Sequence, residues 1–231
     1  MIRRPPRSTQ SRSSAASDVY KRQVDDGSRT EERLQPEDLP ASVRLISLPF
    51  NQGKGSAVRA GMLAASGGCR VFTDIDLPYD LEFIPRALQL IESGFFHFVA
   101  GSRTHHRSIS QVSTPAARRV ISSLLRRLVQ LAVAGGIFDT QCGFKAFSGC
   151  LAERLFPLLT VRGFGFDVEI FYLLSKSDIT IKRLPVTLKR HDVSSVRPLI
   201  DGLRTGLEVL SIPCKWHAGR YDLRPLIEVE Q

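Results

Sequence analysis

The sequence lacks any apolar run of about 18 residues, the length that a membrane-spanning helix requires. The basic stretch at its start also lacks the apolar segment of a secretory signal. We therefore expect a cytoplasmic location, or a peripheral one on the cytoplasmic face of a membrane. Hydrophobic residues nevertheless make up 42% of the chain and charged residues 24%, which is typical of a protein with a folded core.

Cysteine is scarce, and its spacing is uninformative. The four residues show no C-x-x-C pair and stand at Cys69, Cys142, Cys150 and Cys214. A zinc site or a disulfide framework is therefore not expected, and a reducing compartment suits the sequence.

Signatures of two other function classes are also missing. No G-x-S-x-G segment is present, which argues against a Ser-His-Asp hydrolase. No basic patch interleaved with aromatic residues occurs, so no nucleic-acid partner is expected. The net charge of +9 does not change this, because residues 1–23 alone carry +5 and leave +4 for the rest. A basic module that binds anions or membranes without catalysis remains an alternative, and steep salt dependence without a need for metal would favour it.

Residues 1–23 are rich in Ser, Arg and Pro and show no apolar periodicity. Residues 11–23 resemble translated sequencing-adapter sequence, and the alternative is a disordered basic arm. We leave this non-native or disordered leader out of the fold prediction. The predicted folded domain covers residues 24–212, and residues 213–231 are expected to form a C-terminal tail.

Apolar segments that resemble strands alternate with amphipathic segments that resemble helices. This alternation predicts an α/β fold with a mostly parallel sheet flanked by helices, in which ligands bind at the carboxyl ends of strands. We expect strands ending at Asp25 and at 43–48, 70–73, 96–100 and 179–189, and helices at 51–65, 81–92, 115–132 and 198–212.

Two carboxylates follow the apolar run Val71–Thr73. Asp74 and Asp76 are separated by one residue, so on an extended backbone they point the same way. Their mutual repulsion favours a divalent cation such as Mg²⁺ or Mn²⁺, which prefers oxygen ligands. The alternative is a solvated turn at a strand end, because Asp favours turns and Pro78 follows closely.

A glycine-rich turn at 51–56 opens the helix that follows. Free N–H groups at a helix N-terminus suit a phosphate. The turn is not a P-loop, because the earlier glycine of that motif, separated from Gly53-Lys54 by four residues, is missing. The glycines could equally serve only to make a tight bend.

Three later segments also carry charged or polar residues. The helix at 115–132 has one basic face, which suits either solvent or anionic phosphates and membranes. Residues 138–145 place a carboxylate and a carboxamide between two glycine turns, which is more typical of a site than of a core strand. Asp167 lies in the first turn of a helix, where an acid is favourable, and capping of that helix explains it.

Charged residues converge at the ends of the predicted strands. Asp25, Asp26, Asp74, Asp76 and Arg103 all follow strands. Because the carboxyl ends of parallel strands meet at one edge of a sheet, these positions predict one active site.

In order along the chain, these motifs resemble family 2 glycosyltransferases of the GT-A fold. The resemblance is greatest to polyprenyl-phosphate or dolichyl-phosphate sugar transferases and covers residues 24–212. It rests on Val24-Asp25-Asp26-Gly27-Ser28, Asn51-x-Gly-Lys-Gly55 with Ala57, Arg59 and Gly61, Asp74-Ile75-Asp76, Gly101-Ser102-Arg103, Asp139-x-Gln141-x-Gly143-Phe144-Lys145 and Gly165-Phe166-Asp167-x-Glu169.

The resemblance implies an inverting transfer of a hexose from a nucleotide-diphosphate sugar (UDP- or GDP-linked) to a polyprenyl phosphate, assisted by Mg²⁺ or Mn²⁺. A family 2 enzyme with a polysaccharide or protein acceptor is the alternative. The implied roles are metal binding for Asp74 and Asp76; donor binding for Asp25, Asp26, Lys54, Asp74 and Arg103; catalysis for Asp139, Arg103 and Gln141; and acceptor-phosphate binding for Arg118, Ser122 and Arg190.

The sequence departs from the family pattern at two places. Pro78 stands where some relatives have a metal-binding Gln. The first strand and helix of the family, with their Pro-x-Tyr/Asn-x-Glu motif, are missing. We therefore expect this chain by itself to be poorly stable and weakly active or inactive, and a cooperative melt with normal donor affinity would contradict that expectation.

Overall fold

A four-stranded sheet forms the centre of the computed structural model, which describes residues 19–29, 33–74, 82–103, 108–110, 127, 139–188, 198–227 and 229. Its strands are β3 (Cys69–Phe72), β4 (Phe98–Ser102), β6 (Lys145–Ser148) and β7 (Ile181–Pro185), in the order β3-β6-β4-β7. The predicted α/β architecture is confirmed.

The strand β6 makes this sheet mixed rather than parallel. It runs antiparallel to both β3 and β4, whereas β4 and β7 are parallel. Residues 138–145 were interpreted as a site and not as a core strand, yet the chain enters the sheet at Lys145. Each residue of β6 is buried, because both faces of the strand are covered. A strand covered on both faces shows no alternation of polar and apolar residues, so this sequence pattern did not reveal it.

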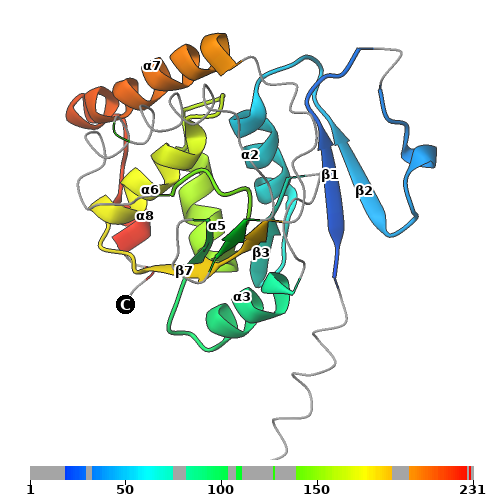
Figure 1. The fold of residues 1–231 in the computed structure, drawn as a ribbon, viewed down its shortest axis with the longest axis horizontal. Helices are drawn as coiled ribbons and strands as arrows, with labels where there is room; N and C mark the ends of the chain where they lie inside the picture. The colour runs from blue at the N-terminus through cyan, green and yellow to red at the C-terminus, as the bar shows by residue number, and fades with distance from the viewer. Residues whose placement is uncertain are drawn as a thin grey trace, which may run out of the picture.

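Successive side chains of the sheet enter two separate apolar cores. Phe98 and Phe147 belong to the larger core, together with residues of α5 (Gly149–Leu155), α6 (Phe166–Lys176) and α7 (Pro198–His217). Val99 and Ala146 belong to the smaller core, under α3 (Phe83–Glu92). The sheet is therefore the middle of three layers, with α3 on one face and the other helices on the opposite face (Figure 1).

The C-terminal residues pack against the larger core. The helix α7 was expected to end at Ile212, but it continues through Pro213 to His217. After it, α8 (Arg224–Ile227) follows, and the apolar side chains of the segment that was separated as a tail are buried in the same core: Tyr221, Leu223, Leu226 and Val229. Among the described residues, no helix is both long and apolar enough to span a bilayer.

A second, two-stranded sheet lies beside α2 (Lys54–Ala64). It pairs β1 (Lys21–Asp25) in parallel with β2 (Val43–Ser47), and the short 3-10 helix η3 (Pro36–Asp38) lies between them in the chain. The strand β1 includes residues 21–23, which the sequence prediction set aside, because backbone pairing requires no apolar pattern. A Cβ on Gly61 of α2 would approach the side chain of Val24 to 3.0 Å, so the helix packs closely on β1.

Three short elements complete the described fold. The strands β5 (Ile109–Ser110) and β8 (Thr187–Leu188) pair in parallel. The 3-10 helix η4 (Phe156–Leu158) follows α5 directly. For the predicted elements that lie within the described residues, the bounds differ from those observed by a few residues at most, as is usual for helix and strand ends. The helix predicted at 115–132 lies outside the described residues, apart from position 127.

Candidate active site

The turn after β1 is held together by the carboxylate of Asp25. This carboxylate accepts hydrogen bonds from the backbone N–H and the hydroxyl of Ser28, at 3.1 and 2.5 Å, and lies 3.7 Å from Nε of Arg33. The Ser28 hydroxyl is the main cause of a lowered pKa for Asp25, with burial opposing it and the Ser28 N–H and Arg33 adding to it. Asp25 is thus a fixed, ionised group at a strand end, as predicted.

Replacing Ser28 by alanine is expected to weaken this turn in a pH-dependent way. The folded pKa of Asp25 lies below the unfolded value of 3.8, so its stabilisation is present above that value and is lost as the pH falls. We expect S28A to lower the free energy of unfolding by about 1 kcal/mol at about pH 7, and by less at about pH 3. Urea unfolding at both pH values measures the difference.

The matched control is Ser93→Ala, because the Ser93 hydroxyl donates to the carbonyl of Leu90 rather than to a carboxylate. Its effect on unfolding should not change between the two pH values. An S28A effect equally large at both pH values would contradict the role given to Asp25.

The carboxylate of Asp26 occupies the glycine-rich turn that was predicted to bind phosphate. It accepts the backbone N–H groups of Gln52 and Gly53, both at 2.8 Å, while the N–H of Ser56 donates to the carbonyl of Arg162 at 3.2 Å. The backbone N–H groups of Gln52, Gly53 and Ser56 are therefore not free for a phosphate. The prediction that this turn binds phosphate is wrong for these three groups. The turn instead ties the end of β1 to the start of α2.

The side chain of Lys54 reaches from the first turn of α2 to the end of β3. Its Nζ lies 2.6 Å from Oδ1 of Asp74, and each of these side chains is about 30% exposed. The other oxygen of Asp74 packs against Gly143, where an added Cβ would come within 1.9 Å of Oδ2. Asp74 therefore lies between α2 and the loop that leads into β6.

Replacing Gly143 by alanine is expected to displace the Asp74 carboxylate rather than to unfold the protein. The clashing atoms belong to the free end of a side chain, which can rotate away. We expect a small change in melting temperature but a loss of affinity of about tenfold for the divalent cation predicted at Asp74, since small shifts around a metal ligand have effects of this order. Titration calorimetry with Mn²⁺ measures it.

Gly68→Ala is the matched control, because an added Cβ there meets nothing within 4 Å. It should leave both melting temperature and cation affinity unchanged. A G143A protein with unaltered Mn²⁺ affinity would contradict the packing of Asp74 described above.

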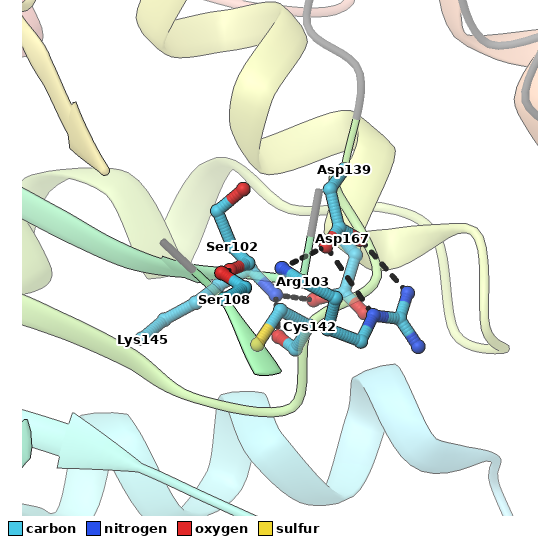
Figure 2. A network of polar contacts seen from close by, with 7 residues as sticks. All are labelled: Ser102, Arg103, Ser108, Asp139, Cys142, Lys145 and Asp167. Atoms are coloured by element: carbon cyan, nitrogen blue, oxygen red, sulfur yellow. Dashed lines mark hydrogen bonds and ion pairs between the residues drawn. The ribbon is translucent and has the colours of Figure 1, made fainter. Parts of the chain in front are cut away.

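Arg103 and Asp139 form a bidentate ion pair at the end of β4. Asp139 Oδ1 accepts from Nη2 of Arg103 at 2.8 Å, and Oδ2 accepts from its backbone N–H at 2.6 Å and its Nε at 3.3 Å (Figure 2). The Asp139 side chain is buried, whereas that of Arg103 is 42% exposed. The guanidinium is therefore oriented by a fixed carboxylate while part of it faces solvent.

A buried ion pair lies behind these residues. Nζ of Lys145, on β6, donates to Oδ1 of Asp167 at 2.6 Å and to the carbonyl of Cys142 at 2.8 Å (Figure 2). Burial raises the pKa of Asp167, and the charges of Lys145 and Lys54 oppose that rise. The electrostatic influence of Lys54 on Asp167 links this pair to the Asp74 side of the site.

Asp167 lies in the first turn of α6, as predicted, but the explanation that it caps the helix is wrong. Gly165 is the N-cap, no side chain caps this end, and the Asp167 carboxylate pairs with Lys145 instead. The sequence prediction also missed Lys145 and Gly143 as residues that support the site. Both occur in the motif from Asp139 to Lys145. Lysine is seldom buried without a partner, so a lysine in an apolar segment such as Phe144–Phe147 could have indicated a pairing with a later acid.

Several predicted site residues lie outside the described part of the chain. These are Asp76 for the metal and Arg118, Ser122 and Arg190 for the acceptor phosphate, together with Pro78. Gln141 is described and half-buried, in the loop between Asp139 and β6.

The described site residues meet at one edge of the sheets. The loop 139–143 contacts both Asp74 and Arg103, and α2 links Asp74 to the Asp26 turn. Carboxylate oxygen atoms such as those of Asp74 suit Mg²⁺ or Mn²⁺, and this carboxylate already faces a cation, the Lys54 ammonium. The described residues contain no group of three or more His, Cys, Asp or Glu side chains that could hold a metal by themselves.

Comparison with known proteins identifies the family. The sequence profile of Glycosyl transferase family 2 matches residues 23–156, more than half of the chain. The chain belongs to glycosyltransferase family 2. The matched span contains Asp25, Asp26, Lys54, Asp74, Arg103 and Asp139, so these residues lie within the family's shared domain.

Relatives of this family 2 chain include dolichyl-phosphate beta-glucosyltransferases. It is 31% identical over 193 residues to one from Dictyostelium discoideum, covering 81% of the chain and 59% of that protein. It is 30% identical over 187 residues to one from Homo sapiens, covering 78% and 57% respectively. The chain thus spans somewhat less than two thirds of the length of these relatives.

Solved structures show the same fold. A glucosyl-3-phosphoglycerate synthase from Mycobacterium tuberculosis, in complex with Mn²⁺, UDP-glucose and phosphoglyceric acid, superimposes with a TM-score of 0.58 at 18% identity. The match covers 83% of this chain and 67% of that one. The GT-A fold implied by the sequence motifs is therefore confirmed.

Proposed function

We propose that this family 2 chain contains the donor site of a glucosyltransferase that moves glucose from a nucleotide-diphosphate sugar, UDP-glucose, to dolichyl phosphate. The observation that carries the proposal is its 30 to 31% identity with dolichyl-phosphate beta-glucosyltransferases over about four fifths of the chain. The same segments supply Asp74, Arg103 and Asp139, whose geometry suits a donor diphosphate.

The acceptor phosphate is chemically ready to react. Its second pKa is near 6, so it is largely ionised at neutral pH and needs no strong general base. One of its oxygens attacks the anomeric carbon, and the bond from that carbon to the donor diphosphate breaks with inversion. No proton has to be removed, which makes Asp139 a residue that positions Arg103 rather than an obligatory base.

The charge that develops on the departing diphosphate determines what the protein must supply. Arg103 offers a half-exposed guanidinium whose direction is set by Asp139 before the donor arrives. Hydrogen-bond donors that are already oriented stabilise a developing charge without the cost of reorganising water. Arg103 therefore acts on the leaving group.

Asp74 would hold a divalent cation together with oxygens of the donor, and Asp76 is the second proposed ligand. When bound, the cation would neutralise the diphosphate. Lys54 now balances the charge of Asp74, at 2.6 Å. We expect Lys54 to turn from Asp74 to the donor phosphates when a cation takes its place, because the ammonium and the cation compete for one carboxylate.

The test measures donor binding and transfer separately. Titration calorimetry with UDP-glucose and with GDP-mannose, each with and without Mn²⁺, reports binding to this chain. Radiolabelled donor with dolichyl phosphate in detergent micelles reports transfer into an extractable lipid. We expect Mn²⁺-dependent binding of UDP-glucose in preference to GDP-mannose, and a slow appearance of label in the lipid, because this chain by itself is expected to be weakly active.

A soluble acceptor, 3-phosphoglycerate, and a peptide–polysaccharide mixture serve as comparison acceptors. Label in one of these and not in the lipid would overturn the dolichyl-phosphate assignment while keeping the family 2 site. Absence of Mn²⁺-dependent donor binding would overturn the proposed donor site itself.

A further inference from the structure

A cysteine, a serine and a histidine meet at the edge of the central sheet opposite the candidate active site. His97 precedes β4, whose other end leads to Arg103, and Ser148 is the last residue of β6. The Ser148 N–H donates to the carbonyl of His97 at 2.9 Å, and its Oγ lies 3.0 Å from Nδ1 of the same histidine. His97 is therefore held against Ser148 at two points, one on its backbone and one on its ring.

The thiol of Cys150 completes this cluster. Its Sγ lies 3.2 Å from Ser148 Oγ and 3.8 Å from His97 Nδ1. Ser148 Oγ also accepts the N–H of Leu151, as the N-cap of α5. The Ser148 hydroxyl is thus fixed between the thiol and the imidazole. It donates its proton to Nδ1 of His97 in the tautomer that leaves Nδ1 unprotonated.

The four cysteines differ sharply in their surroundings. Cys142 is 1% exposed, whereas Cys150 and Cys214 are exposed. Burial and, to a lesser extent, the Glu92 carboxylate raise the pKa of the half-buried Cys69 to about 12, so its thiol stays protonated and is a poor nucleophile. Of the two exposed thiols, only that of Cys150 contacts a histidine among the residues that the structure describes.

We propose that Cys150 is a nucleophilic thiol that forms mixed disulfides with low-molecular-weight disulfides, with Ser148 and His97 as its proton relay. The Cys150 proton passes to Ser148 Oγ as the serine proton passes to His97 Nδ1. The thiolate then attacks one sulfur of the disulfide, whose S–S bond breaks. The departing thiolate takes the proton from His97, so one protein thiol and one disulfide give one mixed disulfide and one free thiol.

The reaction of each cysteine can be measured separately, because trypsin places the four cysteines in different peptides. Cleavage after Lys and Arg places Cys150 in residues 146–154 and Cys214 in residues 205–215, with one cysteine in each peptide. The folded protein is incubated with oxidised glutathione, quenched, digested without reductant and analysed by mass spectrometry. We expect the Cys150 adduct to form about tenfold faster than the Cys214 adduct, in line with assistance by a general base.

The variant His97→Asn removes the base and keeps a polar side chain. It should reduce the Cys150 rate about tenfold and leave the Cys214 rate unchanged. The buried Cys142 should stay unmodified, which shows that the protein remains folded. In concentrated guanidinium chloride the two rates should become equal. Equal rates in the folded parent protein would overturn the proposal. In case H97N does not fold, S148A provides the same test, and an unchanged Cys150 rate in a folded variant would also overturn it.

Discussion

Replacing Asp74 by asparagine is expected to lower Mn²⁺ affinity and Mn²⁺-dependent glycosyl transfer on the order of a hundredfold. The amide loses the negative charge that attracts the cation and that now faces Lys54 at 2.6 Å. Changes to the groups around a bound metal commonly cost tenfold to about a hundredfold in affinity, and removal of a ligand lies at the upper end of that range. Calorimetry with Mn²⁺ measures the affinity even if transfer by this chain is slow.

Two further variants make this prediction specific. Asp222→Asn changes an exposed aspartate that pairs with Arg224, and it should leave cation affinity and transfer unaltered. Lys54→Met removes the competing ammonium, so it should strengthen Mn²⁺ binding while weakening the binding of UDP-glucose. If D74N bound Mn²⁺ as the parent does, the cation site would have to be sought elsewhere.

Replacing Lys145 by methionine is expected to destabilise the protein by about 3 to 5 kcal/mol, the usual cost of leaving one partner of a buried ion pair alone. The Lys145 side chain is fully buried and that of Asp167 is 7% exposed. Asp167 would then lose its partner, and the carbonyl of Cys142 would lose its donor. Urea unfolding monitored by circular dichroism measures the change.

The double variant K145M/D167L tests the reason for this loss. Removing both charges replaces the pair by apolar side chains, so it should recover much of the stability that K145M loses. The exposed pair of Arg224 and Asp222 is the control, and R224M should cause no measurable change. A K145M protein as stable as the parent would show that the buried pair is not needed for the fold.

The residues that face the candidate site could be found from the sequence because they follow strands. Asp74 comes closely after the apolar segment of β3, and Arg103 follows the apolar segment of β4. Asp25 is different, because polar residues precede Val24 in β1, and it was recognised from the motif Val24-Asp25-Asp26-Gly27-Ser28. The position of a residue at a strand end is a local property, so the pattern of apolar residues is sufficient to detect it. The alternation of strands and helices was detectable for the same reason.

The partners of these residues could not be found in this way. Lys54 meets Asp74 20 positions away, Asp139 meets Arg103 36 positions away, and Lys145 meets Asp167 22 positions away. The Asp26 carboxylate also fills the glycine-rich turn, although the turn itself has the composition of a phosphate site. Spacing alone does not specify which charges meet across such distances.

The sequence by itself therefore determined the family, the fold class and the strand ends at which charged residues gather. Only the tertiary structure decided which of those residues are already paired, which are buried, and that β6 runs against its neighbours. The physical reason is that the spacing of apolar residues within a segment depends on which face of that segment packs against the core. The pairing of charges instead depends on where separate segments are brought together, and here the antiparallel entry of β6 carries Lys145 to Asp167 and Gly143 to Asp74.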